Sequence, residues 1–381
     1  NLMFKTNLNI SNNPLIFDFL NFQKEKDSTL TIKVKGNKKI ENNIFFEKIH
    51  LEEKKNSFVV SNLYLDKKNM IKEFKKINFN YLDRDKLKNE ISIVKNEGDY
   101  ILTGKTLNLT KFIDNILDHK KENDKDFFKK KLNLKVDIKK IYLDKNSLLT
   151  DLKGYLVIKD SEIFNAELAS IYSNDKKFTF TVKSKNNQKT TNLFSEYPKP
   201  LVSRYKFIKG FEEGTLDFFS VEKNDTSKSV LIIDNFKLKE VPILAKILTL
   251  ASLQGIADLL TGEGIRFTDF EMKFTNKKGL MTVDEMYAIG PAISILLEGY
   301  IEKQNLISLR GTLVPATTIN RSIASIPLIG NILVGKKAGE GVFGVSFKIK
   351  GPPKKLETTV NPIKTLTPRF ITRTLEKIKK N

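Results

Sequence analysis

Residues 132–143 read LNLKVDIKKIYL, and this alternation of apolar and polar side chains decides the fold. Successive side chains of a β-strand point to opposite faces, so a period of two predicts a strand with one buried face. The pattern recurs along the chain and predicts further strands at residues 29–35, 57–65, 177–183, 230–238, 307–314 and 342–350. The sequence therefore predicts a mostly β protein.

A sheet with one apolar face has to cover that face. It can close into a barrel, pack on a second sheet, or curl into a groove that a ligand fills. Alternation alone does not choose between these arrangements.

Helical patterns are few. Residues 242–260 are apolar on nearly every side, with Pro242 in the first turn and Gly262 just past the end, which predicts one long buried helix. Shorter helices are expected at residues 318–326, from Pro327 onward, and at 368–380.

We divide the chain into three segments by these patterns. Residues 1–125 form a β-rich, repeat-like segment, and residues 126–240 continue it. Residues 241–381 form a C-terminal region with the apolar helix, the closing strands and a basic amphipathic helix.

The net charge of +21 suggests an anionic partner, but only seven of the 66 basic residues are arginine. Sequence-specific nucleic-acid readers depend on the planar fork of arginine. We therefore expect no specific nucleic-acid partner, and a binder of anionic polymers that uses the lysines is a minor alternative.

The residues of common catalytic sites are scarce. The chain has no cysteine, and its two histidines, His50 and His119, lie far apart in the sequence. Disulfides and thiolate nucleophiles are excluded. We expect no enzymatic activity, no cofactor and no metal.

A membrane-spanning anchor is expected outside this chain. No window reaches the roughly 18 apolar residues of a membrane span. The chain begins at Asn1 and has no signal-peptide pattern. We expect a piece of a longer protein, with any anchor lying upstream.

The predicted C-terminal helix is amphipathic. Its apolar stripe and its basic face favour contact with an anionic membrane. The same pattern also suits a helix that caps the last strand, with its charges solvated. The residues expected at the membrane are Arg369, Phe370, Ile371, Arg373, Leu375, Lys377 and Ile378.

Residues 234–370 resemble the C-terminal region of the AsmA-like proteins, in particular the YhdP-type branch. The resemblance is carried by LTLASLQGIADLLTGEGI (248–265), AIGP (288–291), RGTLVP (310–315), IPLIG (326–330) and VNP (360–362). It implies an elongated, curled antiparallel sheet that forms an apolar groove, with a few short apolar or amphipathic helices.

The resemblance also implies a function without chemistry. Such a protein lies in the periplasm, is anchored to the inner membrane upstream, and approaches the outer membrane near its C-terminus. It binds phospholipid and moves it between the two membranes; the resemblance names no protein partner. The alternative is a non-conducting scaffold that assists outer-membrane assembly, with its apolar face closed on itself.

On this resemblance, alternate residues of the late strands line the groove. A slip of one residue in strand register would turn them all outward. The predicted groove residues are Ile295, Leu297, Ile307, Leu309, Leu313, Phe343, Val345, Phe347, Ile349, Leu356 and Val360.

Overall fold

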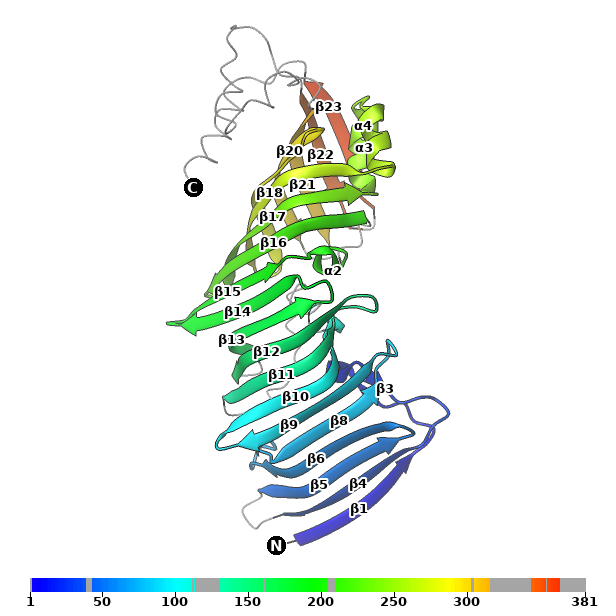
Figure 1. Ribbon diagram of the computed structural model, residues 1–381, viewed down its shortest axis with the longest axis vertical. Coiled ribbons are helices and arrows are strands. Elements are labelled where there is room, and N and C mark those ends of the chain that lie inside the picture. The colour runs from blue at the N-terminus through cyan, green and yellow to red at the C-terminus, as the bar shows by residue number, and fades with distance from the viewer. Residues whose placement is uncertain are drawn as a thin grey trace. The chain divides into compact units, whose positions relative to one another are not determined.

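The computed structural model describes residues 2–38, 43–111, 113, 131–159, 162–204, 210–302, 305–315, 344–353 and 355–363. The chain divides into two compact units, Asn1–Pro200 and Leu201–Asn381. Both units are built mainly of β-strands, as predicted (Figure 1). The unit boundary falls inside the segment 126–240, and the division into three segments stays a prediction.

Unit 1 is a sheet in which β1 pairs with β4, and the strands from β4 to β15 then pair in chain order, β7 and β8 both lying against β6. A small hairpin, β2–β3, interrupts this order. The elements are β1 (Leu2–Ile10), β2 (Ile16–Phe17), η1 (Asp18–Leu20), β3 (Phe22–Gln23), β4 (Leu30–Lys38), β5 (Ile44–Glu53), β6 (Asn56–Leu65), β7 (Ile71–Glu73), β8 (Lys76–Leu82), β9 (Lys88–Asn96), β10 (Asp99–Asn108), β11 (Leu132–Tyr142), β12 (Leu148–Lys159), β13 (Glu162–Tyr172), β14 (Lys177–Lys185) and β15 (Gln188–Ser195), followed by α2 (Lys199–Val202).

One pair of strands differs from the prediction of an antiparallel sheet. β10 and β11 run parallel, with Leu102 opposite Val136. Parallel neighbours need a crossover connection of a dozen or more residues, and residues 109–131 provide one. The unit 1 sheet is therefore mixed, because the chain returns to the start of β10 before it begins β11.

Unit 2 is an antiparallel meander in which each strand from β16 to β23 pairs with the next. Two helices follow β17. The elements are β16 (Gly210–Lys223), β17 (Thr226–Lys239), α3 (Pro242–Leu250), α4 (Gln254–Thr261), β18 (Ile265–Lys277), β19 (Leu280–Ile289), β20 (Ile293–Glu302), β21 (Leu306–Pro315), β22 (Gly344–Gly351) and β23 (Glu357–Ile363).

The predicted helix at 242–260 is wrong in one respect, because the chain forms two helices there. Ser252 takes a left-handed φ of 59°. Its N–H donates to Thr249 O and the Leu253 N–H donates to Leu248 O, the pattern that ends many helices. In the two helices, Leu250 and Leu259 are exposed, so the segment 242–260 is not buried on every side.

The two helices lie against strands from both ends of the unit 2 sheet. α3 packs on β23, and α4 packs on β17 and β18 (Figure 1). Their apolar side chains Leu248 and Leu260 are fully buried. The unit 2 sheet therefore curls until its early and late strands share one helical hairpin.

Bulges keep the apolar residues on one face of each sheet. In β6, Asn62 has a φ of 49°, and Val60 and Leu63 on either side of it face β5 residues Ile49 and Phe46. In β17, Asn235 has a φ of 51° and lies between the buried Ile233 and Phe236. At both positions the facing strand also leaves a residue unpaired, so the pairing register is kept while the alternation of faces is reset and the apolar face continues.

We predict that Gly154→Ala destabilises unit 1 by about 2 kcal/mol or more. Gly154 has a φ of +143°, and a Cβ there would lie 1.8 Å from the carbonyl oxygen of Glu167 in β13. Urea unfolding measures the loss. Gly255→Ala is the control, because a Cβ at Gly255 meets nothing within 4 Å. Equal stability of the two variants would contradict the prediction.

Candidate functional site

A continuous row of paired residues crosses the apolar face of unit 1. The register places one residue of each strand from β4 to β15, except β7, directly opposite the next. The row, here called the unit 1 row, is Val34, Ile49, Val60, Ile77, Ile93, Leu102, Val136, Gly154, Leu168, Phe180 and Leu193. All of these are half-buried except Val136, which is 3% exposed.

The edge of the same face is sealed, in contrast to the row. The hairpin β2–β3 and η1 lie over β6 and β8, where Phe22 packs against Phe58 and Tyr81, with ring centroids 4.8 and 5.9 Å away. The Tyr81 hydroxyl donates to Leu20 O at 3.0 Å. The β2–β3 hairpin and η1 therefore shield this edge from solvent and leave the unit 1 row partly accessible.

Unit 2 has an equivalent row across eight strands. The register joins one residue from each of β16 to β23. The row, here called the unit 2 row, is Phe218, Leu231, Met272, Met286, Leu297, Gly311, Phe347 and Val360. Its first four members are half-buried, whereas Leu297 and Phe347 are buried.

The predicted groove residues that the structure describes share one face of unit 2. Leu297, Phe347 and Val360 belong to the unit 2 row, and Ile295, Leu313 and Val345 form the adjacent row. Leu309 pairs with Ile349 on the other side, and Ile307 lies beyond them in β21. Leu356 immediately precedes β23, and Phe343 lies outside the described residues.

Burial separates these residues into two groups. Leu313 and Val345 are 0% exposed, and Phe347 and Ile349 are 4% exposed. Ile295, Ile307, Leu309, Leu356 and Val360 are half-buried. Part of the predicted set is therefore core of the folded chain, and part remains accessible.

The predicted membrane contacts are not placed. Arg369, Phe370, Ile371, Arg373, Leu375, Lys377 and Ile378 lie outside the described residues. The helices predicted at residues 318–326, from Pro327 and at 368–380 lie outside them too.

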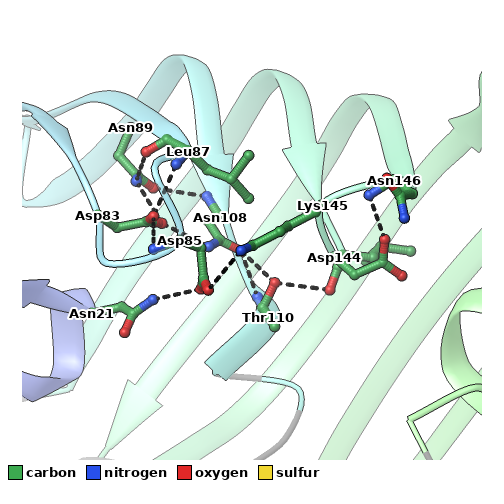
Figure 2. Close-up of polar contacts among 11 residues, drawn as sticks. Asn21, Asp83, Asp85, Leu87, Asn89, Asn108, Thr110, Asp144, Lys145 and Asn146 are labelled. Carbon is green, nitrogen blue, oxygen red and sulfur yellow. Dashed lines mark hydrogen bonds and ion pairs between the residues drawn. The ribbon is translucent and has the colours of Figure 1, made fainter.

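A polar network at the end of β10 is a second candidate site (Figure 2). The Asp83 carboxylate accepts hydrogen bonds from the N–H groups of Asp85 and Leu87 at 2.9 and 3.0 Å. It also accepts from the side-chain amides of Asn89 and Asn108 at 3.2 and 2.6 Å.

The network is structural. Asp83 and Asn89 are buried, and all four hydrogen bonds to the carboxylate come from the protein. Asn108 continues the network by accepting from the Thr110 N–H at 2.9 Å (Figure 2). It fixes the β8–β9 turn to the point where the chain leaves β10 for the crossover.

A hollow of about 520 Å³ over β8–β11 is lined by side chains such as Asn78, Ser92 and Asp137, and it holds an ion pair between Lys105 and Glu90 at 2.8 Å. In unit 2, partial burial raises the pKa of Asp234, with Asp269 and Asp217 adding to the effect.

The described residues show neither a metal-binding cluster nor a membrane-spanning helix. They contain no group of three or more acidic, histidine or cysteine side chains placed to hold a metal ion. Among them there is also no helix with the length and hydropathy that crossing a membrane requires.

Comparisons with known proteins assign no family. No protein-family model, curated protein or solved structure matches the chain significantly. The candidate site therefore rests on its own geometry, and the two rows, half-buried over much of their length, are its most extensive feature.

Sequence reasoning found the alternation in the strands of unit 1 but not the unit 1 row. Its members come from eleven strands, and their alignment depends on each pairing register and on the bulges. The missing signal was the break in alternation at Glu47-Lys48 and at Asn62, which marks where an extra residue resets the faces.

We predict that unit 1 loses stability between about pH 10 and pH 12 in part through Tyr172. Burial raises the pKa of Tyr172 to about 12, and its hydroxyl lies 2.9 Å from Ser195 Oγ. Because the pKa is raised, the folded state favours the neutral phenol. The contribution of Tyr172 to the free energy of unfolding is therefore complete below the pKa of the unfolded chain, near 10, and is lost as the pH rises toward the pKa of the folded state. Urea unfolding at pH 9 and 11 measures the loss. A Tyr172→Phe variant should lose less stability over this interval, and an equal loss would refute the assignment.

Proposed function

We propose that this chain is a lipid-binding segment of a bacterial envelope protein, and that acyl chains lie along the half-buried rows of its apolar faces. The observation that carries the proposal is the unit 1 row. In β4, β5, β6, β8, β9 and β10 the row presents an aliphatic side chain that is only half-buried.

The physical argument is the cost of acyl chains in water. Each methylene group exposed to water costs about 0.8 kcal/mol, so two chains of sixteen carbons would cost on the order of 25 kcal/mol. Neighbouring strands lie about 4.8 Å apart, so a row of aliphatic side chains offers contacts at that spacing along an extended chain. No residue has to perform chemistry, and we propose no enzymatic activity.

The resemblance of residues 234–370 to AsmA-like proteins supports a specific setting. In this proposal the protein lies in the periplasm and is anchored to the inner membrane by a segment upstream. It moves phospholipid between the inner and outer membranes, with its C-terminal part near the outer membrane.

A non-conducting scaffold is the second candidate, and one observation favours it. Leu313, Val345, Phe347 and Ile349, which the sequence placed in a groove, are buried within the folded chain. A face that is sealed in this way would hold the strands together and leave no space for lipid. Sealing of this kind also occurs in β11 of unit 1, where Leu134, Val136 and Ile138 are buried, whereas the members of the unit 1 row in β4 to β10 stay half-buried.

We predict that gently purified chain carries phospholipid and that Ile93→Asp removes it. Ile93 belongs to the unit 1 row and is half-buried, so a carboxylate there stays hydrated and excludes an acyl chain. Extraction with organic solvent and mass spectrometry should give one or more phospholipids per chain. We expect the variant to carry about tenfold less, a change of about 1.4 kcal/mol in binding.

Val94→Asp is the matched control, because Val94 is the next residue of β9, faces the opposite side and is 36% exposed. It should keep its lipid, and both variants should unfold at the same urea concentration. A folded wild-type chain without lipid, or equal lipid loss in both variants, would favour the scaffold. Phe347→Asp is unsuitable, because a charge at a residue 4% exposed would unfold either kind of protein.

A further inference from the structure

Three of the five methionines lie on the apolar face of two neighbouring strands of unit 2. They are Met272 in β18, and Met281 and Met286 in β19. Met272 and Met286 stand directly opposite each other in the register. They form the middle of the unit 2 row, between Leu231 of β17 and Leu297 of β20.

Met272 and Met286 are more accessible than some of their neighbours on the same face, although Phe270 beside Met272 is half-buried as well. Both are half-buried. Phe274, two residues from Met272, is 9% exposed, and Ala288, two residues from Met286, is 5% exposed. Part of each methionine side chain is therefore accessible to solvent, beside a stretch of the face where Phe274, Val283 and Ala288 are buried.

We propose that Met272 and Met286 are an oxidant-sensitive modification site that controls lipid binding along the unit 2 row. The lipid part of this inference rests on the proposed function. The co-reactant is a peroxide: it transfers one oxygen atom to the thioether sulfur, its O–O bond breaks, an S–O bond forms, and hydrogen peroxide leaves as water. The sulfur is oxidised by two electrons and the peroxide is reduced by two.

The product differs from methionine in the property that the row depends on. A sulfoxide is polar and accepts hydrogen bonds, whereas a thioether is flexible and apolar. Two sulfoxides side by side would interrupt the row at its centre. The chain has no cysteine, so its sulfur chemistry is confined to methionine, and a sulfoxide reductase would restore the row.

The experiment treats the folded, lipid-loaded chain with graded hydrogen peroxide. Peptide mass mapping locates the sulfoxides, and solvent extraction measures the bound phospholipid. Met3 is the internal reference, because it is 84% exposed and lies in β1 of unit 1. We expect Met3 to oxidise first and Met272 and Met286 to follow while the chain is still folded.

Variants separate the effect of the pair from general damage. A Met272→Leu/Met286→Leu variant keeps the row apolar and has no sulfur there, so it should bind lipid as the wild type does and retain it after peroxide. Met3→Leu is the matched control, and after peroxide it should lose lipid as the wild type does. We expect oxidation of the wild type to reduce the lipid bound in unit 2 several-fold. Crosslinking of a photoactivatable phospholipid to β18–β20 measures this bound lipid.

Several outcomes would overturn the inference. In the first, Met272 and Met286 stay unmodified when Met3 is fully oxidised. In the second, both become sulfoxides but crosslinking of the phospholipid to β18–β20 does not fall. In the third, peroxide reduces crosslinking in the double leucine variant as much as in the wild type. A chain that is purified without lipid contradicts the proposed function instead. In that case binding of the uncharged probe N-phenylnaphthylamine replaces lipid as the readout, and an oxidised chain that binds the probe undiminished overturns the oxidant site.

Discussion

The register between paired strands is the constraint on which the rest of this structure depends. A slip of one residue in any pair would turn every later apolar side chain to the outer face. Backbone hydrogen bonds fix the pairing, and bulges at positions such as Asn62 and Asn235 restore the alternation where the sequence interrupts it. The unit 1 row and the unit 2 row exist because these local corrections agree from strand to strand.

A sheet whose apolar face is aligned in this way has to protect that face, and each unit does so at its edge. In unit 1, the β2–β3 hairpin places Phe22 over Phe58 and Tyr81. In unit 2, α3 and α4 lie across β17, β18 and β23. Both covers leave a stretch of the face half-buried, the unit 1 row in β4 to β10 and the unit 2 row in β16 to β19. This division between a sealed edge and a partly open middle is what distinguishes the proposed lipid surface from an ordinary core.

The sequence predicted the strands well because alternation is a local property. Residues 29–35, 57–65, 132–143, 177–183, 230–238, 307–314 and 342–350 correspond to β4, β6, β11, β14, β17, β21 and β22. It failed at residues 242–260, where composition favoured one helix and a left-handed Ser252 ends the first of two. It also missed the parallel pair β10–β11, because no local pattern encodes the direction in which a strand returns.

By itself the sequence determined that this is a mostly β protein, because apolar and polar residues alternate with a period of two along most of the chain. In β20 to β22, where the alternation is unbroken, it also indicated which side chains share a face. Only the tertiary structure decided how open that face is. Val345 is sealed and Met286 is half-buried, although both are apolar residues on the same face. Burial depends on the segments that pack over a strand, and these come from distant parts of the chain.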